Sequence, residues 1–96
     1  MTWDKNDHLA IVNRLRRNII VHSVIYYVFN RNLISDSDYD KMCQKLARIH
    51  KKYPKLCSQA VFPKAFKNYD PSTGMNFINH KWGNRAAERL LKSHNK

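Results

Sequence analysis

The apolar residues near the start of the chain recur at the spacing of an α-helix. From about Asp4 to Phe29 they are three to five residues apart, the period that places side chains on one helix face. The stripe consists of Leu9, Val12, Leu15, Ile19, Val24 and Val28. Asp4 or Asp7 can cap the start, because a carboxylate there accepts hydrogen bonds from backbone N–H groups. A long helix is therefore predicted, with Arg14, Arg16 and Arg17 on its other faces.

A strand is the alternative for part of this segment. Ile19 to Phe29 is rich in β-branched residues, but the run is long for a strand and contains no turn signal. The chain has only two Gly and three Pro, too few for the many turns of a sandwich or barrel. With 96 residues, of which 43% are hydrophobic, we expect residues 1–96 to form one small all-α domain.

A second helix is predicted from about Asp36 to Tyr53. Ser35 and Asp38 have the spacing of a capping box, with Asp in place of the usual Glu, and Pro54 ends the helix. Its apolar stripe is Tyr39, Met42, Cys43, Leu46, Ile49 and Tyr53. The two helices are joined by a short connection, because Asn30 favours a helix C-terminus. We therefore expect an antiparallel pair.

A third helix is predicted from Asn76 or Asn79 to Ser93. Its buried face would comprise Ile78, Trp82, Ala86, Leu90 and Leu91. The segment before it is irregular and contains a turn at Asp70–Gly74. The fold prediction is thus a three-helix domain in which the third helix packs across the first two.

The net charge of +11 is unevenly distributed. Residues 1–40 hold five basic and five acidic residues, whereas residues 41–67 hold eight basic residues and no acidic one. The candidate contact residues are Lys41, Lys45, Arg48, Lys51, Lys52, Arg85 and Arg89. One face of the second predicted helix carries Lys41, Lys45, Arg48 and Lys52 at steps of three or four residues. Such a row of cations could follow a phosphate backbone. A polyanionic partner, either nucleic acid or an acidic protein surface, is expected; a merely solvated helix face is the alternative.

The cysteines and histidines suggest no metal site or disulfide framework. Cys43 and Cys57 are the only cysteines, and Cys43 falls on an apolar stripe, where a core thiol is expected. The histidines lack metal-ligand spacing. The N-terminus is polar and the longest apolar run, Ile19–Val21, is too short to cross a bilayer. We expect a reduced, cytoplasmic protein with no metal and no membrane partner.

Residues 26–40 concentrate three Tyr and three Asp in fifteen positions. Tyr26 and Tyr27 end the first predicted helix, and Asp36, Tyr39 and Asp40 begin the second. The chain has only seven acidic residues, so this concentration is not expected by chance. A purely structural role is one interpretation, with the acids capping a helix and the Tyr side chains packing between helices.

The same stretch carries a family resemblance. The matching residues are Leu15-Arg16, Ile19, His22, Tyr26-Tyr27-Val28, Ile34-Ser35-Asp36-Ser37-Asp38-Tyr39-Asp40, Leu46 and Tyr53-Pro54-Lys55-Leu56. Over residues 12–57 they resemble the N-terminal helical domain of bacterial NAD-dependent DNA ligases. Residues 58–96 diverge from that family and are basic.

The resemblance implies a site for the nicotinamide mononucleotide (NMN) half of NAD. By position, Tyr26 would pack against the nicotinamide, and Tyr27 stands where the family has Tyr or His. Asp36, Tyr39 and Asp40 would hold the ribose and phosphate side. His22 lies four residues before Tyr26 on the same helical face, so it could reach the ligand or simply pack in the core.

The sequence lacks the motifs that a DNA ligase needs for catalysis. The linker motif, the Lys-x-Asp-Gly nucleotidyltransferase motif and the zinc-finger cysteines of the ligases are all missing from the sequence. We therefore expect no ligation by this chain, no catalytic residue and no enzyme activity; an enzyme acting on a nucleotide through Asp36, Tyr39 and Asp40 is a weaker alternative.

Two functional hypotheses remain. The first is a binding module that engages NAD or NMN, or that modulates a protein partner of a bacterial host if the chain is a bacteriophage product. The second is a basic, sequence-tolerant nucleic-acid-binding accessory protein, in which the ligase-like helices serve as a scaffold.

Overall fold

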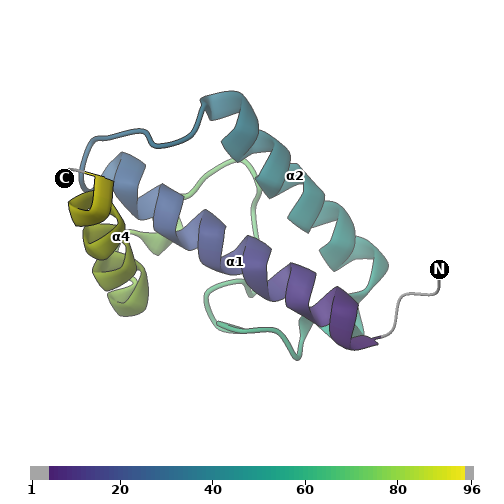
Figure 1. The fold of residues 1–96 in the computed structure, drawn as a ribbon. Helices are drawn as coiled ribbons and strands as arrows, with labels where there is room; N and C mark the ends of the chain where they lie inside the picture. Colours follow the sequence, from purple (N-terminus) through teal and green to yellow (C-terminus); the bar gives the residue numbers. More distant parts are fainter. Residues whose placement is uncertain (1–4, 95–96) are drawn as a thin grey trace.

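The long first helix is the element on which the others pack. The computed structural model describes residues 5–94, and in it α1 (Lys5–Tyr27) lies between α2 (Asp36–Lys52) and α4 (Lys81–His94) (Figure 1). Two short elements, α3 (Pro54–Cys57) and the 3-10 turn η1 (Met75–Phe77), also contact α1. The described residues form helices and no strand, so the all-α prediction is confirmed and the strand alternative is wrong.

The contacts around α1 explain why its apolar face is so broad. One core cluster lies between α1, α2 and the segment after α2, and includes Val12, Leu15, Ile19, Ile20, Cys43, Leu46, Phe66 and Phe77. A second lies between α1 and α4, and consists of Val21, Val24, Ile25, Ala87 and Leu91. Helix α1 is therefore covered on two sides. The prediction that Cys43 is a core thiol is also confirmed, since its side chain is only 2% exposed.

The first two helices form the predicted antiparallel pair (Figure 1). Helix α1 ends at Tyr27, two residues before the predicted end, and Asn30 adopts a left-handed conformation with φ of 54°. The amide of Arg31 bonds to the carbonyl of Ile25 over 3.0 Å, which closes the helix terminus in the manner that Asn permits. The predicted Asp4 cap lies outside the described residues, and Asp7 lies in the first turn of α1.

The start of α2 is as predicted. Ser35 has an extended backbone, and its Oγ accepts a 3.0 Å hydrogen bond from the amide of Asp38. This contact satisfies an N–H that has no partner within the helix. At the other end α2 stops at Lys52, and Pro54 begins the single turn of α3.

The prediction for the start of the last helix is wrong. Helix α4 begins at Lys81, because His80 rather than an Asn caps it: His80 Nδ1 accepts a 3.0 Å hydrogen bond from the amide of Gly83. Asn84 Nδ2 donates to the carbonyls of Ile78 and His80, each over 2.9 Å, and holds the preceding backbone out of the helix. Ile78 consequently lies before α4 rather than on it.

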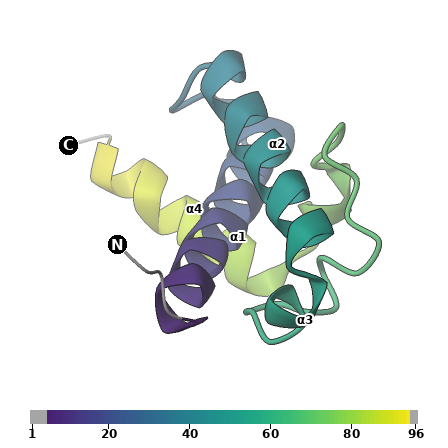
Figure 2. The ribbon, with the colours of Figure 1, turned by 90° about the vertical axis from the view of Figure 1, so that its right-hand side faces the viewer.

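Helix α4 packs across α1 (Figure 2). The prediction had it pack across α2 as well, whereas its main contacts are with α1. Gly83 makes the crossing possible, because a Cβ at this position would overlap Cγ2 of Ile20. Ala87 and Leu91 continue the contact along α4. No helix in the described part of the chain is both long and apolar enough to cross a membrane.

Arg16 lies off the apolar stripe that was predicted for α1, on another face of the helix, but it is buried all the same. Its side chain is only 3% exposed, because the segment after α2 covers that face. Its guanidinium donates to the carbonyls of Val61 over 2.8 Å and Cys57 over 2.9 Å, and lies 3.1 Å from His50 Nε2. Since an arginine can only donate, the His50 nitrogen is the acceptor. Arg16 therefore anchors the segment around Cys57 and Val61 to α1.

Candidate functional site

A pocket of about 240 Å³ lies where the end of α1 meets the start of α2. It is lined by His22, Ile25, Tyr26, Tyr27, Arg31, Asn32, Leu33, Ile34, Asp36, Tyr39, Asp40, Pro71 and Ser72. The structure thus brings together all six residues that the sequence suggested as nucleotide ligands. The antiparallel pairing of α1 and α2 causes this, because it places the C-terminal turn of one helix beside the N-terminal turn of the other.

The aromatic part of the pocket comes from the last turn of α1. Tyr26 and Tyr27 are 48% and 42% exposed, and their ring centroids are 4.9 Å apart in an edge-to-face arrangement of 85°. A single exposed tyrosine is common on a protein surface, but these two rings are neighbours and both line the pocket. Two neighbouring rings left open at a pocket are therefore available to pack against a planar ligand.

Tyr39 presents its ring to the pocket and its hydroxyl to the core. The hydroxyl lies 2.6 Å from Oγ of Ser23, which is fully buried and itself donates to the carbonyl of Ile19 over 2.6 Å. Because a hydroxyl has one proton, Tyr39 must be the donor in this pair. Burial raises the pKa of Tyr39, so it stays neutral. Its ring, more than its hydroxyl, is thus available to a ligand.

The polar part of the pocket is dominated by acceptors. Asp36 and Asp40 are exposed and lie four residues apart, on one side of the first turns of α2. His22 is partly buried; its Nδ1 is buried with no hydrogen-bond partner among the described residues. Burial lowers the pKa of His22, so its ring is neutral at pH 7. Arg31 is the cation of the lining.

This combination suits a ligand of defined chemistry. Two carboxylates beside open aromatic rings attract a flat cation, by charge and by the negative faces of the rings. The carboxylates can also accept hydrogen bonds from hydroxyl groups. Within the described residues no group of three or more His, Cys, Asp or Glu side chains could hold a metal ion.

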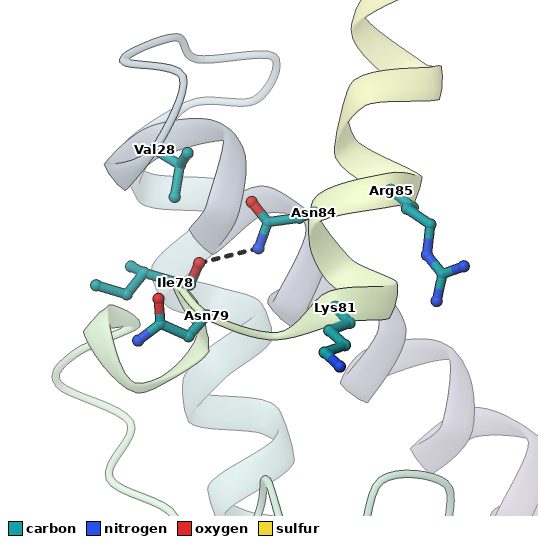
Figure 3. A pocket seen from close by; sticks show the side chains of 6 residues that line it. All are labelled: Val28, Ile78, Asn79, Lys81, Asn84 and Arg85. Carbon is teal, nitrogen blue, oxygen red and sulfur yellow. Dashed lines mark hydrogen bonds between the residues drawn. The ribbon is translucent and has the colours of Figure 1, made fainter.

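A larger and shallower groove, of about 820 Å³, lies between the end of α1 and the start of α4 (Figure 3). Asn84 already donates across it to the carbonyl of Ile78, and the side chains of Lys81 and Arg85 extend away from Val28 (Figure 3). The polar groups of the groove do not converge on a common point. A ligand would therefore find fewer hydrogen-bonding partners together in the groove than in the smaller pocket.

The basic candidates lie in two separate places. The side chains of Lys41, Lys45, Arg48, Lys51 and Lys52 are all exposed on α2, and those of Arg85 and Arg89 are exposed on α4. Helices α2 and α4 lie on opposite sides of α1 (Figure 1). The structure therefore does not bring the two sets together on one surface.

Some lining residues were not anticipated from the sequence. Pro71 and Ser72 belong to a turn that the sequence signalled, but nothing local indicates where that turn packs. Arg31 and Asn32 lie in the α1–α2 connection, so its position between the helix ends could have suggested them.

The comparisons with known proteins point to the same region. The family described as DNA ligase-like, N-terminal NAD+-binding domain, matches residues 5–60. The DNA ligase of Thermosipho africanus (strain TCF52B) is 40% identical over 55 residues, which are 57% of this chain and 8% of that ligase. The DNA ligase of Pelotomaculum thermopropionicum (strain DSM 13744 / JCM 10971 / SI) is 38% identical over 56 residues, 58% of this chain and 8% of that ligase.

The similarity ends before the last third of the chain. The DNA ligase of Fervidobacterium nodosum (strain ATCC 35602 / DSM 5306 / Rt17-B1) is 42% identical over 45 residues, 47% of this chain and 7% of that ligase. The chain therefore spans less than a tenth of the length of the ligases that it matches, and no solved structure matches it. Because the family match covers more than half of the sequence, the chain belongs to the family of DNA ligase-like N-terminal NAD+-binding domains.

Proposed function

We propose that this protein is a non-catalytic binding module for a nicotinamide nucleotide, either NMN or the NMN half of NAD. The observation that carries the proposal is the convergence of His22, Tyr26, Tyr27, Asp36, Tyr39 and Asp40 on one pocket. All six lie inside the segment that matches an NAD+-binding domain.

The roles follow from the chemistry of each side chain. The oxidised nicotinamide ring is a flat cation, and it would pack against Tyr26 and Tyr27. Asp36 and Asp40 would accept hydrogen bonds from the ribose hydroxyls and favour the ring's positive charge. His22 also lines the pocket and would pack beside the ligand, while its buried Nδ1 is closed to solvent and so to the ligand.

The size of the pocket supports one half of a dinucleotide. Pockets for drug-sized ligands usually measure about 300–1,000 Å³, and this one measures about 240 Å³. No lysine lines it, so it contains no amine that could attack a pyrophosphate. These features support binding rather than ligation.

Calorimetry tests the proposal directly. Titration of NMN and NAD into the wild type should give measurable heat, and Asp36→Ala or Tyr26→Ala should each weaken binding about tenfold. Tyr53→Ala is a matched control, because Tyr53 is an exposed tyrosine at the far end of α2, outside the pocket. The absence of heat for the wild type at millimolar ligand would overturn the proposal.

A second candidate function is binding of nucleic acid or an acidic protein by α2. Five exposed cations along one helix, in a stretch without acidic residues, favour it. In a gel shift at low salt, replacing Lys45, Arg48 and Lys52 by Glu should abolish binding, whereas the same change at Arg85 and Arg89 should preserve most of it. Equal loss in both variants, or in neither, would contradict a specific role for α2. We also propose a bacterial cytoplasm as its location, that of a host if the chain is phage-encoded, because the relatives that it matches are DNA ligases.

A further inference from the structure

One wall of the nucleotide pocket comes from outside the family match. Pro71 and Ser72 line the pocket, although the match ends at residue 60. The other lining residues all belong to the segment 22–40. This chain therefore adds a contact region of its own to a site that is otherwise built from family residues.

The turn that carries this wall is anchored from both sides. Before it, the hydroxyl of Tyr69 donates to the carbonyl of Cys43 on α2 over 3.2 Å. After it, Gly74 is buried so closely against Ser23 and Tyr39 that a Cβ would overlap Ser23 Oγ and the Tyr39 hydroxyl. Tyr39 also lines the pocket, so the same side chain that bounds the site also positions the turn.

The turn is held internally by one carboxylate. Asp70 Oδ1 accepts hydrogen bonds from the amide of Ser72 over 2.9 Å and from Ser72 Oγ over 2.6 Å. The hydroxyl proton of Ser72 is thereby used, and its lone pairs are left to accept a further bond. The Ser72 hydroxyl oxygen can therefore accept a hydrogen bond from a ligand in the pocket, and the negative Asp70 carboxylate is bonded to the same hydroxyl.

We propose that the Asp70–Gly74 turn makes the pocket select nicotinamide nucleotides over nicotinic acid nucleotides, and this rests on the proposed function. Ser72 accepts a hydrogen bond from the carboxamide N–H₂ group of nicotinamide. The carboxylate of nicotinic acid has no such donor at neutral pH. The described lining has two carboxylates, Asp36 and Asp40, against one cation, Arg31. Asp70 lies behind Ser72, so the net charge around the site disfavours a second negative group. A site built to accept from a donor group discriminates strongly against an analogue that lacks that group.

The test measures the affinities of NMN and nicotinic acid mononucleotide for the same proteins by calorimetry. We expect the wild type to bind NMN about tenfold or more tightly than nicotinic acid mononucleotide. Ser72→Ala should lower this ratio of affinities by about threefold or more. Asp70→Asn should lower it as well, because the amide oxygen can keep both bonds to Ser72 while the charge is lost. Ser58→Ala is the control, since Ser58 also donates a 2.6 Å bond to a nearby residue but lies outside the pocket.

The possible outcomes separate the two proposals. A lowered ratio in Ser72→Ala and Asp70→Asn, with Ser58→Ala unchanged and all melting temperatures similar, supports selection by the turn. A wild type that binds both nucleotides equally, or a ratio that neither turn variant alters, overturns the inference and leaves the proposed function intact. A wild type that binds neither nucleotide overturns the proposed function, and the inference falls with it.

Discussion

The hydroxyl of Tyr39 donates a 2.6 Å hydrogen bond to Oγ of Ser23, and this bond joins α2 to the buried face of α1. Its position is central to the pocket. The ring of Tyr39 bounds the pocket on one side, and Gly74 packs on the hydroxyl end on the other. The pair therefore connects helix pairing, the turn at Asp70–Gly74 and the candidate ligand site.

The first prediction separates the structural and ligand-binding parts of Tyr39. Tyr39→Phe keeps the ring but removes the donor, so we expect a loss of about 1 kcal/mol in the free energy of unfolding. Urea denaturation would measure this. Affinity for NMN should stay within about threefold of the wild type, because the hydroxyl is occupied in the core. Tyr27→Phe is the control for stability, since Tyr27 is 42% exposed. A large loss of affinity in Tyr39→Phe would show that the hydroxyl itself contacts the ligand.

The second prediction concerns the close contact at Gly74. Gly74→Ala adds a methyl group where Ser23 Oγ and the Tyr39 hydroxyl already lie. Overpacking of this kind typically costs about 1–3 kcal/mol, so thermal unfolding should show a clear decrease in melting temperature. Gln59→Ala, at an exposed position in another loop, should leave it nearly unchanged. A stable Gly74→Ala protein that binds NMN normally would mean that the turn can move away without affecting the pocket.

Local chemistry explains which parts of the fold could be predicted. The start of α2 depends on Ser35 and Asp38, which are three residues apart, so the capping pattern is visible in the sequence. The start of α4 depends on His80, a residue that seldom caps helices, and the start predicted at Asn76 or Asn79 therefore lies too early in the sequence. The burial of Arg16 could not be predicted, because periodicity does not reveal that a later segment covers its face of α1.

The pocket also has one part that could be predicted from the sequence and one part that could not. Its helical part could be predicted, because a short connection forces the Tyr residues at the end of α1 next to the Asp residues at the start of α2. The wall at Pro71 and Ser72 could not. It depends on how Gly74 packs against two side chains that are 35 and 51 residues away in sequence, and no local pattern encodes such a contact.

The third prediction concerns the buried guanidinium of Arg16. Arg16→Lys keeps the charge, but a single ammonium group cannot replace a fork that bonds to the carbonyls of Val61 and Cys57. We expect a loss of about 2–4 kcal/mol in the free energy of unfolding, measured with urea, because buried acceptors lose their donors. Arg17→Lys is the matched control at the next position, where the side chain is exposed, and it should change stability by less than about 0.5 kcal/mol. Equal stability of the two variants would contradict an anchoring role for Arg16.

The last prediction is that the protein loses stability as the pH falls from about 6.5 to about 4. Burial and the adjacent Arg16 guanidinium lower the pKa of His50 from 6.5 to about 4, and burial also lowers the pKa of His22 and His80. Between those pH values the unfolded chain binds protons that the folded chain does not, so acidification favours unfolding. The stabilisation is complete above pH 6.5 and is lost as the pH falls through the folded-state pKa. Urea denaturation at a series of pH values would measure the slope, and His50→Gln should make it shallower, because a neutral amide can still accept from Arg16 without titrating. An unchanged slope in His50→Gln would show that His50 does not contribute to it.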